Sequence, residues 1–329
     1  MQRNASRKWL GVNESPKQSS ERGLMGGRVF VIGGGGFLGS EFCKIAAINH
    51  DVVVCDSPER LRSISTSLNQ VEYDFGNQNP DCIPCSRGDK AVVFSWRGYP
   101  AVHEENPVET LERNLRSTLQ LIRFLVAKGV EDIFYASSGG AVYGSMAGRA
   151  ALESDPVNPV GFYGIGKATA EMYVRKIVSE SASRYMIFRI GNAYGKGQLE
   201  RNLSVGFLAH AIRSAQSGRE LSLWGDGSIA RDYIHSEDIA SGMEVCLNLN
   251  KVPSGTYNLG TGKATDQLQI VRIVEKILGK KINLMTYPSR NFDVQSISLN
   301  SNLLFEKTGW KACLDIESGI LDFFNIGEL

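Results

Sequence analysis

The stretch Gly33-Gly34-Gly35-Gly36-Phe37-Leu38-Gly39 decides the fold of this chain of 329 residues. It follows Arg28-Val-Phe-Val-Ile32, a β-branched and aromatic run typical of a strand buried in a parallel sheet. Apolar residues then recur at helical spacing over 37–49, and residues 51–55 predict a second buried strand. Together these segments form a βαβ unit of the usual ~30 residues.

Strand and helix patterns continue to alternate over the first half of the chain. Further strands are predicted at 70–73, 91–95, 132–136 and 184–190. Long helices are predicted at 107–128 and 161–181. This alternation predicts an α/β fold, a doubly wound parallel Rossmann sheet with right-handed crossovers.

The pattern also divides the chain into parts. Residues 1–24 are polar and aperiodic, so we expect a disordered N-terminal extension. Residues 25–190 are predicted to form a dinucleotide-binding Rossmann domain, and 191–329 a smaller substrate-binding lobe with helices at 204–217 and 266–278. We expect 232–260 to return to the first domain, so that the two are partly interleaved.

The charge balance excludes several classes of partner. Lysine and arginine number 36 against 35 acidic residues, and no long run of one sign suggests a nucleic-acid or membrane surface. No apolar stretch is long enough to span a bilayer or act as a signal peptide. A small-molecule partner and a cytoplasmic location are therefore expected.

Neither the cysteines nor the histidines predict a metal site. The six cysteines are scattered without a disulfide framework, as expected in a reducing compartment. Cys82 and Cys85 have the spacing of a zinc or redox pair, but no second pair or nearby histidine follows. The histidines His50, His103 and His210 lack ligand spacing.

The glycine-rich stretch has the features of a pyrophosphate site. Backbone N–H groups and a helix N-terminus bind a pyrophosphate only if no side chain blocks it, and Gly33, Gly36 and Gly39 meet that need. Asp56 follows twenty residues after Gly36, where a carboxylate can accept both hydroxyls of an adenosine ribose. Asp56 would repel a 2′-phosphate, which favours NAD over NADP. The nearby Arg60 argues against this preference.

Tyr163 and Lys167 are four residues apart in a predicted helix, so they lie on one face. An ammonium within a few ångströms favours the phenolate and lowers the pKa of a tyrosine. We therefore expect Tyr163 to accept a proton near neutral pH.

Several motifs occur in order along the chain. They are Gly-Gly-x-Gly-Phe-Leu-Gly at 33–39, Ser137-Ser138 before Val142-Tyr143-Gly144, Tyr163-x-x-x-Lys167, Arg189-x-x-Asn192-x-Tyr194-Gly195, Trp224-Gly-Asp-Gly with Arg231-Asp232-Tyr233-Ile234-His235, and Tyr257-Asn258-Leu259-Gly260-Thr261-Gly262. In these motifs the chain resembles the extended short-chain dehydrogenases/reductases, specifically the NAD-dependent nucleotide-sugar epimerase/dehydratase group of the UDP-glucose 4-epimerase type. The resemblance runs from about Arg28 to the C-terminus.

The resemblance implies catalytic roles for three positions. Tyr163 is the implied acid/base, Lys167 binds the nicotinamide ribose, and a Ser or Thr three residues before Val142 contacts the sugar hydroxyl. Here that position is Gly139, a departure from the family. Either a local backbone shift brings in Ser138, which we favour, or the phenol acts alone.

The two residues after Gly139 bear on the type of reaction. Relatives that eliminate water or decarboxylate place acidic groups directly after the Ser or Thr. Gly140 and Ala141 carry none. We therefore disfavour a 4,6-dehydratase or a decarboxylase.

The resemblance also implies binding residues. Phe37 and Leu38 belong to the cofactor loop, Asp74 and Phe75 match the position that touches adenine, and Asn114 matches a helix asparagine near the cofactor. The alternative for Asp74 and Asn114 is a local hydrogen-bonding role. The implied substrate-binding residues are Asn192, Asn202, Arg231 and Arg290, the two arginines facing phosphates.

A second departure lies at Phe94-Ser95-Trp96-Arg97, where relatives usually have a histidine and small residues. Trp96 and Arg97 are bulky. They either close over the nicotinamide side or shape the sugar pocket, or they point away from the cleft.

The favoured function is a nucleotide-sugar 4-epimerase that oxidises the sugar transiently at C4 and keeps NAD bound. The alternatives are a 4-keto-sugar-nucleotide reductase and a non-catalytic NAD-binding protein of the same fold. By resemblance we expect a homodimer formed through the helices at 107–128 and 161–181.

Overall fold

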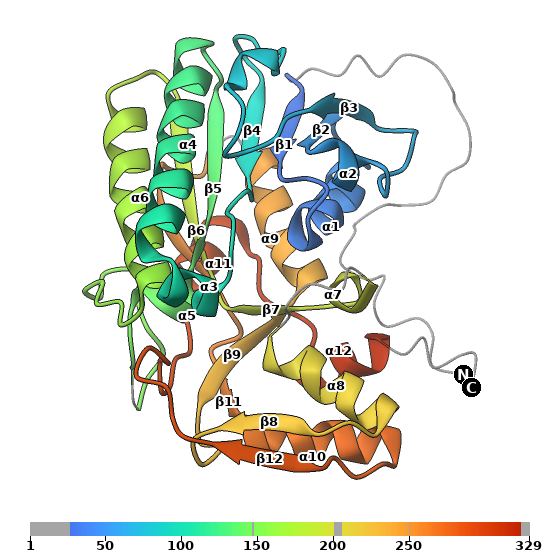
Figure 1. The fold of residues 1–329 in the computed structure, drawn as a ribbon. Helices are drawn as coiled ribbons and strands as arrows, with labels where there is room; N and C mark the ends of the chain where they lie inside the picture. Colours follow the sequence, from blue (N-terminus) through green and yellow to red (C-terminus); the bar gives the residue numbers. More distant parts are fainter. Residues whose placement is uncertain (1–26, 147, 201–205, 250, 324–329) are drawn as a thin grey trace.

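A sheet of seven parallel strands forms the centre of the computed structural model, which describes residues 27–146, 148–200, 206–249 and 251–323 (Figure 1). The strand order is β10-β6-β5-β4-β1-β2-β3. The strands are β1 (Val29–Ile32), β2 (Val52–Asp56), β3 (Asn69–Glu72), β4 (Lys90–Val93), β5 (Asp132–Ser138), β6 (Arg184–Ile190) and β10 (Gly255–Leu259). The predicted doubly wound Rossmann sheet is confirmed, whereas the expected extension at 1–24 lies outside the described residues.

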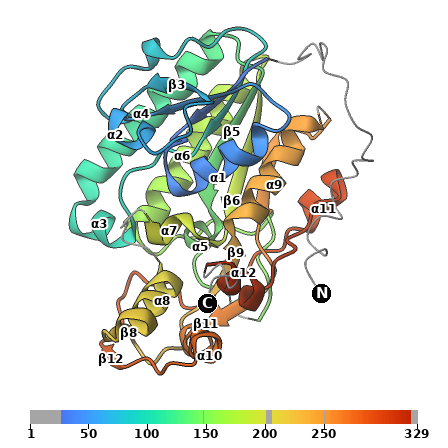
Figure 2. The ribbon, with the colours of Figure 1, turned by 90° about the vertical axis from the view of Figure 1, so that its right-hand side faces the viewer.

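Helices cover both faces of this sheet (Figures 1 and 2). On one face α1 (Phe37–Ala46) packs against α9 (Ser236–Asn248), with Phe42 and Met243 in the shared core. On the other face α4 (Pro107–Ala127) packs against α6 (Phe162–Ser179), with Leu121 and Val174 in the core. The central strands β1 and β2 are buried on both sides, which explains why their sequences are almost continuously apolar, whereas the edge strand β3 is polar and mostly exposed.

The helix predicted at 37–49 is shorter in the structure. It ends at Ala46, and a tighter turn follows, in which the amides of Ile48 and Asn49 bond to the carbonyls of Ile45 and Ala46. Ile48, whose apolar side chain suggested a longer helix, faces solvent. An exposed apolar residue therefore produced the error in this boundary.

The second half of the chain contributes strands both to the large sheet and to a second sheet. Strand β10 pairs with β6 at the edge of the large sheet, and α9 lies against α1, so this segment returns to the first half of the fold. Strand β9 (Ala230–His235) lies between β7 (Asn192–Tyr194) and β11 (Ala264–Asp266) in a second, three-stranded sheet.

A smaller lobe lies below the large sheet in the view of Figure 1. It contains the parallel pair β8 (Leu221–Trp224) and β12 (Leu284–Tyr287), and the helices α8 (Phe207–Ser217), α10 (Gln267–Leu278) and α12 (Ile316–Phe323). Leu208, Ile270 and Ile320 belong to its separate core. The short elements elsewhere are α2 (Pro58–Leu61), η1 (Pro80–Cys82), α3 (Pro100–Glu105), α5 (Gly139–Val142), α7 (Gly197–Glu200) and α11 (Asn302–Thr308).

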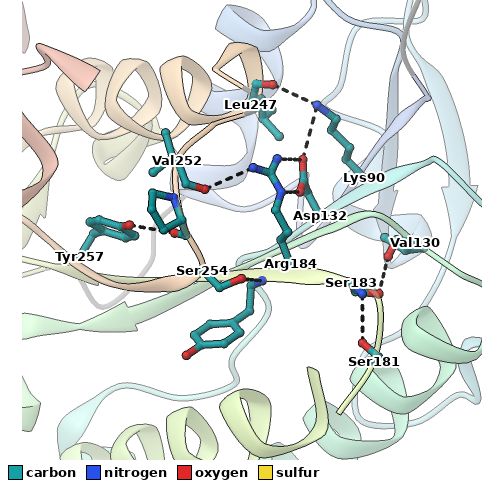
Figure 3. Close-up of polar contacts among 12 residues, drawn as sticks. Lys90, Val130, Asp132, Ser181, Ser183, Arg184, Leu247, Val252, Ser254 and Tyr257 are labelled. Atoms are coloured by element: carbon teal, nitrogen blue, oxygen red, sulfur yellow. Dashed lines mark hydrogen bonds and ion pairs between the residues drawn. The ribbon is translucent and has the colours of Figure 1, made fainter. Parts of the chain in front are cut away.

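A buried ion cluster ties the amino ends of three central strands together (Figure 3). Asp132, the first residue of β5, is fully buried and accepts two hydrogen bonds from Arg184, at 2.7 and 2.9 Å. Lys90 lies 3.4 Å from the same carboxylate and donates to the carbonyl of Leu247 in α9. Arg184 also donates to the carbonyl of Val252. The cluster thus attaches the returning segment to the sheet.

None of the helices in the described part of the chain is long and apolar enough to cross a membrane.

Asp132→Ala should destabilise the protein by about 3–5 kcal/mol, because it leaves the buried charge of Lys90 and the partly buried charge of Arg184 without their carboxylate. Urea denaturation monitored by circular dichroism measures the free energy of unfolding. The control is Glu317→Ala, which removes the exposed pair with Lys276 and should cost under about 1 kcal/mol. Equal losses in the two variants would contradict this account.

Candidate active site

A cavity of 540 Å³ opens at the carboxyl ends of the central strands. This is the edge at which open parallel sheets bind ligands. The residues that line it come from the glycine turn, the segment after β4, the end of β5, the start of α6 and the loop at 292–294. Of the residues singled out from the sequence, the lining includes Gly33, Gly36, Phe37, Leu38, Gly39, Ser138, Tyr163, Lys167, Asn192 and Arg231.

The glycine turn leaves no room for side chains. Gly33 has φ +83°, and a Cβ there would lie 2.7 Å from the Ser95 hydroxyl. A Cβ on Gly39 would lie 2.2 Å from the carbonyl oxygen of Gly33. Gly36 directly precedes α1, and the first turn of this helix faces the cavity. This turn contains no acidic side chain that would repel an anion. This cradle and the positive end of α1 fit a dinucleotide pyrophosphate.

Asp56 ends β2 beside this turn. Its carboxylate accepts hydrogen bonds from the amides of Gly35 (2.9 Å) and Ser57 (2.8 Å), and Arg60 Nη1 lies 4.0 Å away. Asp56 is nearly buried and does not itself line the cavity, but Arg60 does. The carboxylate is therefore fixed next to the place where the adenosine half of a dinucleotide would leave the glycine turn.

Tyr163 and Lys167 lie in the first two turns of α6 and both face the cavity. Lys167 Nζ donates to the carbonyl of Ala136 at 2.8 Å and lies 4.4 Å from the centre of the Trp96 ring. Burial lowers the pKa of Lys167 to about 7, and the carboxylate of Glu171, one turn later, opposes this shift.

The expected lowering of the Tyr163 pKa is wrong for this structure. Burial of the phenol raises its pKa to about 12, and a hydrogen bond with Ser138 only partly offsets that. The ammonium of Lys167 is bonded to Ala136 and covered by Trp96, and its charged form is itself disfavoured by burial. The four-residue spacing correctly predicted that both side chains face the same way. It did not predict that desolvation of the phenol outweighs the effect of the neighbouring ammonium on its pKa.

The structure explains the glycine at position 139. A Cβ on Gly139 would lie 2.5 Å from Leu299 Cδ1, so a serine at this position would meet a packed side chain instead of the cavity. The preceding residue, Ser138, lines the cavity and forms the hydrogen bond with Tyr163. Of the two alternatives drawn from the sequence, the geometry favours Ser138.

Trp96 and Arg97 point in different directions. The indole of Trp96 meets the Tyr163 ring edge-on and stacks on His103, with ring centroids 6.5 and 6.1 Å away. A Cβ on Gly166 would come within 3.2 Å of Trp96 Cζ2, so the tryptophan occupies a slot that the glycine leaves open. Arg97 turns away and bonds to the Asp74 carboxylate and to the carbonyl of Phe75.

Asp74, Phe75 and Asn114 do not line the cavity. Asp74 pairs with Arg97, and Phe75 is buried in the core. Asn114 is fully buried and bonds to both the amide (2.7 Å) and the carbonyl (2.9 Å) of Arg97. Its hydrogen bonds therefore fix the backbone that follows β4.

The residues that the resemblance implies for substrate binding are only partly brought together. Arg231 and Asn192 line the cavity. Arg290 does not, because it forms a two-point ion pair with Asp293 and lies over the Trp224 ring. Asn202 lies outside the described residues.

A buried network supports the site from behind. Arg189 donates to Glu171 at 2.7 Å, and Glu171 accepts a hydrogen bond from Ser137, the neighbour of Ser138. The guanidinium of Arg189 also lies 4.7 Å above the ring of Tyr143. These contacts hold the end of β5 against α6, the two elements that carry Ser138, Tyr163 and Lys167.

Sequence reasoning missed several residues of the cavity wall, among them Glu104, Phe292 and Asp293. They lie in a short helix and an irregular loop, where neither periodicity nor a motif distinguishes them. His103 is buried, and burial lowers its pKa. In the described part of the chain, no cluster of histidine, cysteine and acidic residues has the geometry of a metal site.

A model of the NAD dependent epimerase/dehydratase family matches residues 29–260. The chain belongs to this family. The match includes the glycine turn, Tyr163 and Lys167, and it ends after the strand β10 that returns to the large sheet.

Relatives in this epimerase/dehydratase family include UDP-glucose 4-epimerases. UDP-glucose 4-epimerase 4 of Oryza sativa subsp. japonica is 30% identical over 332 residues, covering 90% of this chain and 89% of the relative. The enzyme of Mus musculus is 29% identical over 328 residues, covering 88% and 93%. The crystal structure of the Thermus thermophilus UDP-glucose 4-epimerase with NAD matches with a TM-score of 0.81, 26% identity and coverage of 92% and 100%.

Lys167 should make the stability of this family member depend on pH. Its folded pKa of about 7 lies below the ordinary 10.5, so between these values the folded protein binds fewer protons than the unfolded chain. The free energy of unfolding therefore rises with pH across this window. Lys167→Met should remove about 2 kcal/mol of that rise between about pH 7 and 9, as measured by urea denaturation.

The control for this prediction is Lys176→Met, an exposed lysine on the same helix. It should leave the pH dependence as it is in the wild type. If Lys167→Met also leaves the pH dependence unchanged, then the ammonium of Lys167 is not desolvated, contrary to what the structure indicates.

Proposed function

We propose that this protein is an NAD-dependent nucleotide-sugar 4-epimerase. One observation carries the proposal: Tyr163, Ser138 and Lys167 meet in a single cavity that continues from the glycine turn to Arg231. The named activity of the relatives supports a UDP-hexose as substrate. The lack of an acidic side chain at Gly140 and Ala141 argues against elimination of water.

In this proposal the cofactor lies along the amino end of α1. The pyrophosphate is held by backbone groups of Gly33, Gly36 and the first turn of α1. That turn contains Phe37, Leu38 and Gly39. Asp56 accepts the hydroxyls of the adenosine ribose, and Lys167 holds the nicotinamide ribose. Asp74, Phe75 and Asn114 act indirectly, by fixing Arg97 and the backbone near the adenine.

The chemical step depends on the side chains of Tyr163 and Ser138. Tyr163 removes the proton of the sugar C4 hydroxyl and later returns it, while Ser138 orients that hydroxyl through its contact with the phenol. When bound, NAD⁺ supplies the acceptor for the C4 hydride and a positive charge that favours the phenolate of Tyr163. Trp96 keeps the surroundings of Tyr163 apolar.

The diphosphate end of the substrate lies at Arg231. Its guanidinium lines the cavity and matches the planar geometry of a phosphate. Asn192, the first residue of β7, faces the sugar. Arg290 reaches the diphosphate only by leaving its ion pair with Asp293, and Asn202 is proposed as a further contact.

Tyr163→Phe should lower turnover of UDP-glucose to UDP-galactose by about 10²–10⁴-fold, because the general acid/base is lost. A coupled assay for UDP-galactose measures turnover, and absorbance of the extracted protein measures bound NAD(H). The matched control is Tyr173→Phe, an exposed tyrosine on the same helix. It should leave turnover at the wild-type level.

Other outcomes of this experiment identify the alternatives. Wild-type protein that carries no NAD(H), but reduces a 4-keto sugar nucleotide with added reduced cofactor, is a reductase. If the wild type and Tyr163→Phe both bind NAD(H) equally well and neither turns over UDP-glucose, the protein is a non-catalytic NAD-binding protein. Each result overturns the epimerase proposal.

We further propose a homodimer formed through α4 and α6. These helices lie side by side on one face of the sheet (Figure 1). Their outer surfaces expose a set of large apolar side chains, namely Val108, Leu111, Phe162, Ile165, Met172 and Tyr173. Burying this surface against a second copy removes apolar area from water.

Met172→Glu should convert the dimer into a monomer, because it places a charge in the apolar interface. Size-exclusion chromatography with light scattering gives the mass. Ile48→Glu is the control, since Ile48 is 70% exposed, against 61% for Met172, but lies beside α1 on the opposite face. A wild-type protein of monomer mass would refute the dimer.

The cysteines support a cytoplasmic location. All six are free thiols, and two of them, Cys82 and Cys313, are exposed. Exposed free thiols persist in reducing compartments.

The strand pairing supports the division of the chain into domains. Residues 25–190, joined by 232–260, are proposed to form the NAD-binding domain, and 191–329 to contribute the substrate lobe. The pairing of β10 with β6 and the packing of α9 on α1 support this division.

A further inference from the structure

We propose that Glu104 restricts the site to sugars without a negative charge, so that it accepts a neutral hexose and rejects the uronic acid of the same nucleotide. This inference rests on the proposed function, and it assigns a role to a residue that carries no motif. Its basis is the position of one carboxylate in the cavity wall.

Glu104 reaches the cavity from α3. Its Oε1 accepts a hydrogen bond of 2.6 Å from the amide of Phe162, the first residue of α6 and the neighbour of Tyr163. A Cβ on Gly161 would lie 2.8 Å from the same oxygen and 3.4 Å from the Cβ of Phe292. The carboxylate is thus fixed at the point where α3, the start of α6 and the 292–294 loop meet.

This point lies on the path that the sugar takes. The C4 hydroxyl belongs at Tyr163 and the diphosphate at Arg231, so the hexose ring spans the space between them. Asp293 lines the cavity and acts electrostatically on Arg231, while its neighbour Phe292 and Glu104 both lie against Gly161 at the start of α6. A substituent on the ring, such as the C6 group, therefore faces this wall.

The cationic side chains that line the cavity do not neutralise the carboxylate of Glu104. Three cationic side chains line it, and each has a place elsewhere: Arg60 beside Asp56, Lys167 on the Ala136 carbonyl, and Arg231 at the diphosphate end. No ion pair among the described residues includes Glu104. Arg290 lies over the Phe292 ring but is held in its two-point ion pair with Asp293. A second carboxylate brought to this wall therefore meets repulsion from Glu104 while the nearby arginine is already paired.

The other residues of this wall suit a neutral ring. Trp96, Tyr99, Val160 and Phe292 present carbon surfaces to the cavity. A hydroxymethyl group at C6 can donate a hydrogen bond to the Glu104 carboxylate, whereas a carboxylate at C6 cannot. The wall therefore distinguishes the two oxidation states of the same carbon.

Glu104→Gln separates this charge from the structural role of the residue. The amide oxygen of glutamine can still accept the hydrogen bond from Phe162, so the start of α6 keeps its partner. The neighbouring Glu105 is exposed and does not line the cavity, which makes Glu105→Gln the matched control.

The test compares UDP-glucose with UDP-glucuronic acid, which differ only at C6. Isothermal titration of the full-length protein, purified with its bound cofactor, gives the two dissociation constants. We expect the wild type to bind UDP-glucose at least about tenfold more tightly. Glu104→Gln should reduce this ratio by about tenfold, while Glu105→Gln leaves it unchanged.

Equal affinities in the wild type, or the same ratio in Glu104→Gln as in the wild type, would overturn the inference. If Glu104→Gln does not fold, Glu104→Ala tests the same ratio with the charge removed. Failure of the proposed function is distinguishable, because it appears as wild-type protein that does not epimerise UDP-glucose, whatever the binding ratio.

Discussion

The close approach of the β1–α1 turn to its neighbours is the constraint on which the rest of the structure depends. The carbonyl of Gly33 lies where a side chain on Gly39 would be, and Ser95 at the end of β4 lies where a side chain on Gly33 would be. Because no Cβ intervenes, α1 starts directly at the edge of the sheet. Its amino end then faces the same cavity as α6, so the proposed cofactor site shares one space with Tyr163 and Lys167.

Much of the fold and part of the site were predictable from the sequence. The buried strands and long helices follow from apolar periodicity, a signal that local sequence carries. That Tyr163 and Lys167 share a helix face follows from their spacing, whereas Ser138 was expected beside them from the family resemblance, with the phenol acting alone as the alternative. The pKa of Tyr163 was not predictable, because it depends on how many atoms of other segments surround the phenol. Glu104 was missed for a related reason, since its position depends on a short helix that carries no repeating pattern.

Buried charge is arranged at both ends of the central strand β5. At its amino end Asp132 joins β4, β6 and α9, and at its carboxyl end Ser137 contacts the Glu171–Arg189 pair. Each buried charge is paired and hydrogen-bonded, which offsets its desolvation only when the geometry is good. The strand that carries Ser138 is thus held at two points, which limits its movement relative to α6.

The contact between Trp96 and Gly166 constrains the order in which substitutions can accumulate. A Cβ at position 166 would lie 3.2 Å from Trp96 Cζ2, so a side chain there would push the indole aside by a few tenths of an ångström. A smaller residue at 96 would remove this contact, whereas an alanine at 166 introduced first would crowd the indole against α6. The two positions therefore form an epistatic pair, in which the effect of each substitution depends on the residue already present at the other.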